Sequence, residues 1–313
     1  MSARLRLGVD IGGTKTEAVV VTPAGDILAQ ARLDSGFGPD AVVATTLDVI
    51  RRVCADAGIE PRETSIGVGI PGAIDTRTGT VSHAINLGLE HLPLRSQLRE
   101  ALGADVSIEN DVNAAALGAF HIMKRPAESS MAYLNLGTGL AAGLVLDGQL
   151  WRGARGAAGE IGHILVDPNG PLDLDGQRGG LEAMASGSGI ARQWGAGERG
   201  TVTAVLDAAD AGDERAIAIR TRLHESVAAA VRILVLTVDV DVVVIGGGIS
   251  RLGERLTAGV EEVFAGWASV SPFIASLDLP GRMLLLPDGA PVAALGAAWL
   301  GTAAPAARET SRG

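Results

Sequence analysis

The chain has 313 residues, of which 47% are apolar and 20% are charged, and its formal net charge is −10 at neutral pH. This apolar content is enough for a large buried core and argues against a disordered chain. The length is long for a single core, so we expect two domains that share a cleft. No run of Lys and Arg exceeds two residues, which together with the acidic balance argues against a nucleic-acid-binding protein.

Segments rich in Val, Ile and Leu alternate with Ala-rich segments of helical length, which predicts an α/β fold. The expected strands are LRLGVDI, TEAVVVT, SIGVGI, DVSIEN, MAYLNLG, AAGLVL, DVVVIGGG and RMLLLP. The expected helices cover residues 40–57, 94–102, 111–123, 202–210, 213–238, 251–266 and 291–301.

These elements suggest a domain division. We place a smaller α/β domain at residues 1–122, completed by a C-terminal helix at 291–303, and a larger one at 123–290. Residues 304–313 are Ala-rich, polar and charged, and we expect them to form a flexible tail.

The N-terminus enters an expected strand directly, without the apolar region of a signal peptide, and no apolar run is long enough to span a membrane. We therefore expect a cytoplasmic protein without membrane contact. The single cysteine, Cys54, falls in an expected helix. A buried structural thiol is the favoured interpretation over a nucleophile.

The first glycine-rich motif, DIGGTKT, covers residues 10–16 at the end of the first expected strand. Gly12 and Gly13 permit a tight turn and a close approach of the backbone. Thr14 and Lys15 follow with polar groups, so the turn suits a phosphate cradle. The spacing differs from that of a Walker A loop, which disfavours the P-loop fold. An ordinary hairpin turn is the alternative interpretation.

A second motif, GVGIPG at residues 67–72, matches the G-x-G-x-x-G pattern of dinucleotide-binding proteins. Pro71 argues against that interpretation because it biases Ile70 away from a helical conformation. The following AIDTRTGTV is expected to continue as turn and strand instead of a crossover helix.

The segment IENDVNAAALGAF, residues 108–120, ends an expected strand with Glu109, Asn110 and Asp111 and continues as an Ala-rich helix. Asn110 or Asp111 as a helix N-cap is one interpretation. The other places Asp111 in the cleft, where it accepts the proton of an attacking hydroxyl. A helix N-terminus would keep this carboxylate ionised, and phosphoryl transfer needs an aspartate mainly to orient the nucleophile.

A second hairpin, YLNLGTGLAAGLVLDGQL at residues 133–150, repeats the order of strand, glycine turn and strand found at residues 8–28, with Gly137 aligned to Gly12. Chance similarity between hairpins is one explanation. An old duplication is the other, in which two similar domains each offer one glycine hairpin to a nucleotide held between them.

Two further glycine positions are candidates for nucleotide contact. Thr138 and Gly139 lie in the turn of the second hairpin. VVVIGGGIS ends an apolar strand in three glycines, and its Gly247 and Gly248 would let a flat base or ribose approach the backbone. A strand-to-helix turn without a ligand is the alternative for this last motif.

Candidate sugar contacts follow the second hairpin. In GARGAAGEIGHILVDP, Glu160 and His163 are three residues apart and share one side if the segment is helical. Glu182, in GGLEAMASGSG, could supply another acceptor. A carboxylate and an imidazole together suit vicinal hydroxyls, whereas a structural His and a solvated Glu are the alternatives.

Taken together, these stretches resemble the ROK family of bacterial sugar kinases and sugar-responsive repressors. The similarity runs from DIGGTKT through GVGIPGAID, ENDVNAAALG, LGTGLAAGLVLDGQLWRG, GEIGH, GLEAMASGSGI and VVIGGG to ALGAAWLG. It implies an actin-like, ribonuclease H-like fold with two similar domains around a cleft. It also implies ATP and Mg²⁺ as cosubstrates and phosphorylation of a hexose or N-acetylhexosamine, commonly at the 6-hydroxyl.

The resemblance also assigns roles by position. Asp111 corresponds to the catalytic base, and Asp10 resembles the acidic residue near the metal and phosphates. The implied sugar ligands are Gly72, Asn86, Asn110, Asp111, Glu160, His163 and Glu182. The implied ATP-binding residues are Gly12, Gly13, Thr14, Lys15, Thr138, Gly139, Gly247 and Gly248.

One departure from the family concerns zinc. The family usually has a zinc site made by the His of GEIGH and three cysteines in a C-x-C-G-x-x-G-C-x-E pattern, and Asp173, Asp175 and Gly180 stand at the cysteine positions here. Two carboxylates and one imidazole leave a tetrahedral site short of a ligand. We therefore expect no structural zinc. The two aspartates are either solvated or accept a hydrogen bond from His163.

The leading hypothesis is an ATP-dependent hexose kinase, with glucose first and N-acetylmannosamine or N-acetylglucosamine as alternative acceptors. Polyphosphate is a less favoured donor because the chain lacks a basic track. A sugar-sensing repressor would need a helix-turn-helix segment before the first glycine motif, and only nine residues precede Asp10. A sugar-binding regulator without kinase activity is the remaining alternative. As partners we expect a sugar, ATP and a second copy of the chain in a homodimer, and no nucleic acid.

Overall fold

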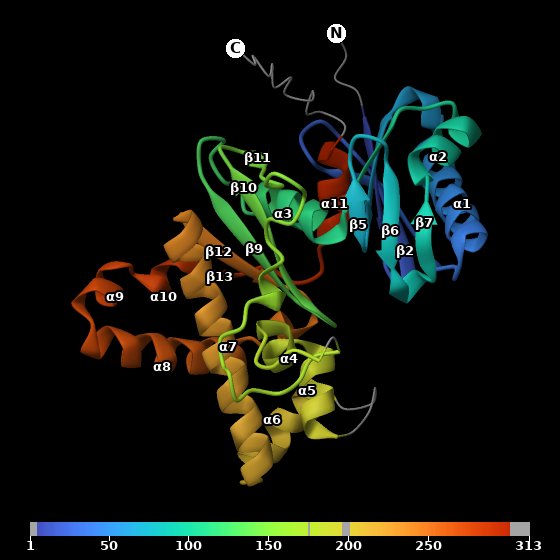
Figure 1. The fold of residues 1–313 in the computed structure, drawn as a ribbon. Coiled ribbons are helices and arrows are strands. Elements are labelled where there is room, and N and C mark those ends of the chain that lie inside the picture. Colours follow the sequence, from blue (N-terminus) through green and yellow to red (C-terminus); the bar gives the residue numbers. More distant parts are fainter. Residues whose placement is uncertain (1–4, 175, 196–200, 301–313) are drawn as a thin grey trace, which may run out of the picture. The chain divides into compact units, whose positions relative to one another are not determined.

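The computed structural model describes residues 5–174, 176–195 and 201–300. The described residues form two compact units (Figure 1). Unit 1 comprises residues 5–124 and 291–300, and unit 2 comprises the described part of 125–290. Each unit has its own buried apolar core, and both mix helices with a sheet, so the α/β prediction is confirmed.

The main sheet of unit 1 has the strand order β3-β2-β1-β4-β8. Its first three strands form an antiparallel meander, and β4 and β8 then add in parallel to β1. The strands are β1 (Arg6–Ile11), β2 (Lys15–Val21), β3 (Ile27–Asp34), β4 (Ser65–Ile70) and β8 (Val106–Asn110).

The sheet of unit 2 repeats this topology in the order β11-β10-β9-β12-β13. Here too a three-stranded meander is followed by two parallel strands. The strands are β9 (Met131–Leu136), β10 (Leu140–Leu146), β11 (Gln149–Leu150), β12 (Val242–Gly246) and β13 (Met283–Leu285). The repeat predicted from the two glycine hairpins is therefore present in three dimensions.

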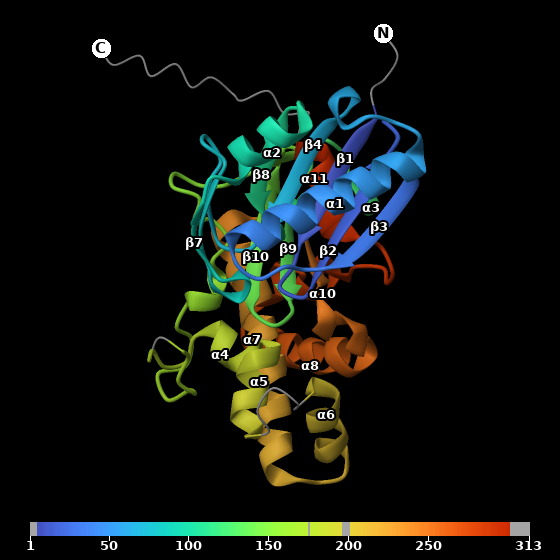
Figure 2. The ribbon, with the colours of Figure 1, turned by 90° about the vertical axis from the view of Figure 1, so that its right-hand side faces the viewer.

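Four helices pack on the main sheet of unit 1. Figure 2 shows α1 across one face of this sheet, with α3 and α11 behind it. The helices are α1 (Pro39–Ala57), α2 (Leu94–Leu102), α3 (Asp111–Ile122) and α11 (Val292–Trp299). Cys54 lies in α1 and is 1% exposed, and burial raises the pKa of its thiol to about 11, which confirms a structural thiol.

Unit 1 also contains a small antiparallel sheet that was mostly not predicted. Only the strand expected within AIDTRTGTV corresponds to it. Its strands are β5 (Ala73–Asp75), β6 (Thr80–Ala84) and β7 (Leu89–Leu92), and a 3₁₀ turn at Ile85–Leu87 joins the last two. β5 follows β4 after Pro71 and Gly72, so no crossover helix follows the GVGIPG motif, as predicted.

Unit 2 contains seven helices within its described residues. They are α4 (Leu181–Ala185), α5 (Gly187–Trp194), α6 (Val202–Asp210), α7 (Glu214–Val238), α8 (Glu254–Val270), α9 (Pro272–Ser276) and α10 (Leu279–Arg282). Across all the residues described, no helix combines the length and hydropathy that a membrane crossing needs.

Most expected helices match within a few residues, and two differ. The helix expected at 251–266 begins at Glu254, because a 3₁₀ helix (Gly248–Leu252) precedes it and Gly253 interrupts with φ 56°. The helix expected at 291–301 ends at Trp299. The last residues of the predicted C-terminal helix at 291–303 and the predicted tail at 304–313 lie outside the described residues.

Glycines let α11 pack against its neighbours at backbone distance. Gly8 on β1 and Gly67 on β4 are paired in the sheet. A Cβ at Gly8 would lie 1.9 Å from the Ala294 carbonyl oxygen, and a Cβ at Gly67 would lie 1.8 Å from the Ala297 carbonyl oxygen. On α3, a Cβ at Gly118 would lie 2.0 Å from the Val292 carbonyl oxygen. Any side chain at these positions would push α11 away from the sheet and from α3.

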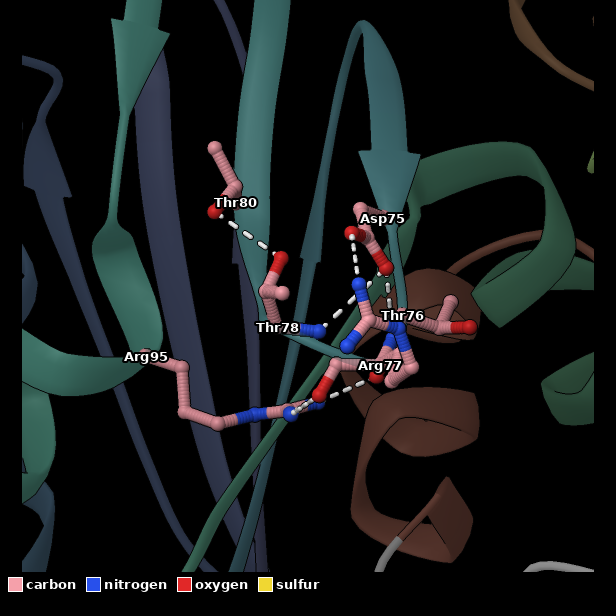
Figure 3. Close-up of polar contacts among 6 residues, drawn as sticks. All are labelled: Asp75, Thr76, Arg77, Thr78, Thr80 and Arg95. Carbon is pink, nitrogen blue, oxygen red and sulfur yellow. Dashed lines mark hydrogen bonds and ion pairs between the residues drawn. The ribbon is translucent and has the colours of Figure 1, made fainter.

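Arg95 ties the turn of the β5–β6 hairpin to α2 (Figure 3). Its guanidinium donates from Nη2 to the Thr76 carbonyl at 2.6 Å and from Nη1 to the Arg77 carbonyl at 2.7 Å. Asp75 closes the same turn by accepting from the Arg77 and Thr78 backbone N–H groups at 2.9 and 3.3 Å. The hairpin that connects Gly72 to Asn86 is therefore anchored by one arginine.

We expect Gly118→Ala to lower the free energy of unfolding by about 1–3 kcal/mol, because the new methyl overlaps the backbone of α11. The matched control is Gly266→Ala, since Gly266 also lies inside a helix and a Cβ there meets nothing within 4 Å. That change should leave stability unchanged or raise it by up to about 1 kcal/mol. Denaturant unfolding of both variants measures the difference, and equal effects would contradict the packing argument.

We expect Arg95→Ala to destabilise unit 1 by about 1–3 kcal/mol, because two charge-assisted hydrogen bonds to backbone carbonyls are lost. Arg99→Ala is the control on the same helix, since its exposed pair with Asp105 is worth about 0–1 kcal/mol. Thermal denaturation compares the two. If Arg95→Ala lowers the melting temperature no more than Arg99→Ala does, the two Arg95 hydrogen bonds contribute little to stability.

Candidate functional site

The strand β8 passes into helix α3 without a loop, and this turn carries the END motif. Asn110 ends β8 and caps α3, because its side-chain Oδ1 accepts from the backbone N–H groups of Val112 at 2.9 Å and Asn113 at 3.2 Å. Asp111 is the first residue of the helix, and its Oδ1 accepts from the Val112 N–H at 3.0 Å. The helix N-terminus favours the ionised carboxylate.

Glu109, which the sequence interpretation left without a role, supports this turn from inside the protein. It is 2% exposed, and its Oε1 accepts from the Asn110 N–H and from Asn113 Nδ2, both at 3.0 Å. On the other side, Asn110 Nδ2 donates to the Gly72 carbonyl at 3.4 Å. The predicted sugar residues Gly72, Asn110 and Asp111 are therefore brought together.

Asp10 lies on β1 at the sheet position next to Gly69 of β4. A Cβ at Gly69 would be 3.1 Å from the Ala114 Cβ and 3.5 Å from the Asp111 Cα, so α3 begins directly over this part of the sheet. Burial and, to a smaller extent, the negative charges of Asp111 and Glu17 together raise the pKa of Asp10 to about 7. Two carboxylates therefore face one small region that favours a cation or a proton.

The charge of Asp10 is partly balanced along the sheet. Asp10 pairs with Glu17 on β2, and Glu17 pairs with Arg32 on β3. Glu17 Oε1 accepts from Arg32 Nη2 at 2.7 Å, from Arg32 Nε at 3.0 Å and from Gln30 Nε2 at 2.7 Å. Arg32 is the group that lowers the pKa of Asp10. The sequence analysis assigned no role to Glu17, Gln30 or Arg32, because these residues become neighbours only when the strands pair.

The first glycine turn, residues 12–14, is held by backbone contacts. The Gly12 N–H donates to the Lys15 carbonyl at 2.9 Å, and the Ser35 hydroxyl donates to the Gly12 carbonyl at 2.7 Å. A Cβ at Gly13 would lie 3.2 Å from Asn86 Nδ2, so this turn lies against a predicted sugar residue. Lys15 forms an exposed ion pair with Asp34.

The second glycine turn, residues 137–139, has the same place in unit 2. It closes with the Gly137 N–H donating to the Gly139 carbonyl at 3.0 Å. The backbone N–H groups of Gly187 and Ser188 donate to the carbonyls of Gly137 at 2.8 Å and Thr138 at 3.1 Å. The turn that carries the predicted nucleotide contacts is thus attached to the start of α5.

The predicted sugar residues of unit 2 lie on a 3₁₀ turn and on the neighbouring helix α4. Glu160 precedes a 3₁₀ turn (Ile161–His163), so Glu160 and His163 stand at its two ends and both are exposed. A Cβ at Gly162 would lie 3.2 Å from the Glu182 Cβ. Glu182 lies on α4, and its Oε2 accepts from the Leu140 N–H at 2.9 Å.

The three glycines at the end of β12, of which Gly246 is the last strand residue, differ in their surroundings. A Cβ at Gly246 would lie 2.3 Å from the Tyr133 hydroxyl, and one at Gly247 would lie 2.5 Å from the Leu136 carbonyl oxygen. Gly247 also has φ 86°, a conformation that favours glycine. These two glycines are therefore required by packing inside unit 2. A Cβ at Gly248 meets nothing within 4 Å, so its position leaves space for a ligand.

The segment at the family's zinc position is held by hydrogen bonds in its described residues. Asp173 Oδ1 accepts from the Gln177 N–H at 2.7 Å, and the Gly179 N–H donates to the Pro171 carbonyl at 2.9 Å. Asp175 lies outside the described residues. Within the described part of the chain, no three His, Cys, Asp or Glu side chains are grouped as metal ligands would be.

Comparison with known proteins identifies relatives over most of the chain. The model of the ROK family matches residues 6–303. A glucokinase of Halalkalibacterium halodurans is 33% identical over 290 residues, which cover 86% of this chain and 87% of that protein. An N-acetylmannosamine kinase of Haemophilus influenzae is 30% identical over 268 residues, which cover 84% of this chain and 87% of that protein.

Two solved structures are similar over 95% of this chain. A ROK hexokinase from Thermus thermophilus matches with a TM-score of 0.78 at 31% identity and 97% coverage of its chain. A ROK glucokinase from Streptomyces griseus, solved with glucose and AMPPNP, matches with a TM-score of 0.74 at 28% identity and 98% coverage. The predicted actin-like ATPase fold is confirmed. On its sequence and on its fold, the chain belongs to the ROK family.

Proposed function

We propose that this protein is an ATP-dependent sugar kinase that transfers the γ-phosphoryl group of ATP to a hexose, with the 6-hydroxyl of glucose as the first candidate. The observation that carries the proposal is the β8–α3 turn, which holds Asp111 at a helix N-terminus beside Asp10. The glucokinase and hexokinase relatives support a hexose acceptor. N-acetylmannosamine is the second candidate acceptor, because kinases of that sugar are also similar over most of the chain.

In this proposal Asp111 is the general base. Its carboxylate accepts the proton of the sugar hydroxyl while the hydroxyl oxygen bonds to the γ-phosphorus, and the bond from that phosphorus to the leaving oxygen of ADP breaks. The Val112 N–H fixes one carboxylate oxygen and the N-terminus of α3 keeps the group ionised. Glu109 and Asn113 hold the turn from the buried side, so Asp111 needs little reorganisation.

ATP would be held by backbone groups, since the chain has few cationic clusters. We assign the phosphates to the turn of Gly12, Gly13, Thr14 and Lys15 and to Thr138 and Gly139, and the nucleoside side to Gly247 and Gly248. The Gly248 position suits this role because it is open, whereas Gly247 shapes the turn.

The residues near Asp10 fit a magnesium ion. Mg²⁺ is usually bound through one or two carboxylates together with waters and substrate phosphates, and the buried Asp10 offers one such carboxylate. When bound with ATP, the ion neutralises charge on the phosphate oxygens. Glu17 and Arg32 would orient Asp10 from the neighbouring strands.

We assign the contacts with the sugar hydroxyls to the predicted sugar residues, which are Gly72, Asn86, Asn110, Asp111, Glu160, His163 and Glu182. We also propose a cytoplasmic location, where ATP is available, and a homodimer as the assembled form.

We expect Asp111→Asn to lower kcat by about 10²–10⁴-fold, because an amide keeps the shape of the side chain and cannot take up a proton. Glucose KM should change much less. Asp105→Asn is the control, since Asp105 is an exposed aspartate just before β8 whose ion pair with Arg99 is on the surface. Steady-state kinetics with glucose and ATP measure both variants. A kcat within about tenfold of wild type would remove Asp111 as the base.

We expect the purified protein to contain no stoichiometric zinc, because closed structural sites take four ligands and are usually rich in thiolates, and the single cysteine of this chain, Cys54, is buried in α1. A chelator should then stop activity by removing Mg²⁺ alone. Elemental analysis and thermal denaturation with EDTA provide the test. About one zinc per chain, with a melting temperature that falls on chelation and recovers with Zn²⁺ but not Mg²⁺, would make Asp173 and Asp175 metal ligands.

A further inference from the structure

The tip of the β9–β10 hairpin, residues 137–140, is attached to the segment that carries Glu182. Three of the four residues of the hairpin tip form hydrogen bonds with residues 182–188. Gly137 and Thr138 accept from the N–H groups of Gly187 and Ser188, as described above. The Leu140 N–H donates to Glu182 Oε2 at 2.9 Å. The candidate phosphate turn of unit 2 therefore has its geometry set from α4 and α5.

The contact of Glu182 with this turn is close on its other side as well. A Cβ at Gly139 would lie 2.7 Å from Glu182 Oε2, so the carboxylate lies directly against the Gly139 backbone. A side chain at position 139 would displace this carboxylate. A displacement of Glu182 would therefore remove both the hydrogen-bond acceptor of the Leu140 N–H and the carboxylate that contacts Gly139.

The same glutamate borders the Glu160–His163 turn. A Cβ at Gly162 would lie 3.2 Å from the Glu182 Cβ and 2.2 Å from the Leu140 carbonyl oxygen. The Leu181 N–H donates to the Ile164 carbonyl at 3.1 Å, which ties α4 to the end of that turn. Within unit 2, the turn between Glu160 and His163 is therefore bordered both by the Leu140 backbone and by the Glu182 side chain.

A carboxylate has two oxygens and about four acceptor positions, so Glu182 can accept from the Leu140 N–H and from a sugar hydroxyl together. Sugar binding would restrict the rotamers of Glu182 and fix the acceptor of Leu140. A turn fixed in this way loses less conformational freedom when a nucleotide binds, and the second ligand binds more tightly.

We propose that Glu182 is a positioning residue that couples sugar binding to nucleotide binding, through its contact with the Leu140 N–H and Gly139. The inference rests on the proposed function and assigns to Glu182 a task beyond contact with the sugar. Because coupling is reciprocal, the nucleotide must raise the affinity for sugar by the same factor.

The test measures AMPPNP binding by calorimetry, with Mg²⁺, in the absence of glucose and at saturating glucose. The ratio of the two dissociation constants is the coupling factor, which we expect to be about 5–150 for the wild type. Glu182→Ala and Glu182→Asp should bring the factor close to one. Alanine removes the acceptor, and aspartate keeps the charge but is one methylene too short to reach Leu140. Glu182→Gln keeps a carbonyl acceptor and should retain most of the coupling.

Glu160→Ala is the matched control, because both glutamates are candidate sugar ligands and Glu182 is the one hydrogen-bonded to the turn. It should weaken glucose binding and keep the wild-type factor at saturating glucose. A wild-type factor in either Glu182→Ala or Glu182→Asp, or a factor near one in the wild type, would overturn the inference. Loss of coupling in Glu160→Ala would overturn it too, because the effect would then follow sugar contact in general.

The outcome separates this inference from the proposed function. A wild-type protein that phosphorylates glucose with a coupling factor near one would refute the coupling alone. A protein that shows coupled binding of glucose and AMPPNP but transfers no phosphate from ATP would refute the kinase assignment alone. Failure to bind any hexose would refute both.

Discussion

The β8–α3 turn of unit 1 depends on how closely helices can approach its sheet. Gly8, Gly67 and Gly69 lie on adjacent strands and leave out the side chains that would hold α11 and α3 away. The first residue of α3 can therefore begin directly over β4. This places the Asp111 carboxylate beside Asp10, which no loop of ordinary length could do with the same rigidity. Backbone contact, more than side-chain contact, positions the acid groups.

Two carboxylates brought together in this way carry an electrostatic cost, and Arg32 offsets only part of it, because Glu17 raises the pKa of Asp10 more than Arg32 lowers it. Glu17 is the strand neighbour of both Asp10 and Arg32. Its carboxylate forms the ion pair with Arg32, so the positive charge of Arg32 is balanced mainly by Glu17 and does not neutralise Asp10. The remaining negative potential favours a cation. An acidic chain can thus bind an anionic cosubstrate locally, because a metal ion and backbone N–H groups supply the attraction that surface lysines do not.

The sequence predicted the features that depend on local patterns. The glycine hairpins, the cap at Asn110 and most helix bounds follow from turn chemistry and periodicity, and Pro71 correctly excluded a dinucleotide-binding turn. Features that depend on strand register or tertiary packing could not be predicted from the sequence. Glu17 and Arg32 become neighbours only when β1, β2 and β3 pair, and Glu182 meets Leu140 across 42 residues. The roles assigned to single site residues remain predictions.

The two units have one topology but support their glycine turns differently. In unit 1 the turn is closed by Ser35, which follows β3, and lies against Asn86. In unit 2 the meander ends in the two-residue strand β11, and the support comes from α4 and α5 instead. In unit 2 the segment that supports the glycine turn therefore also carries Glu182. In the proposed coupling, the turn of unit 2 responds to the sugar through Glu182, which accepts from the Leu140 N–H.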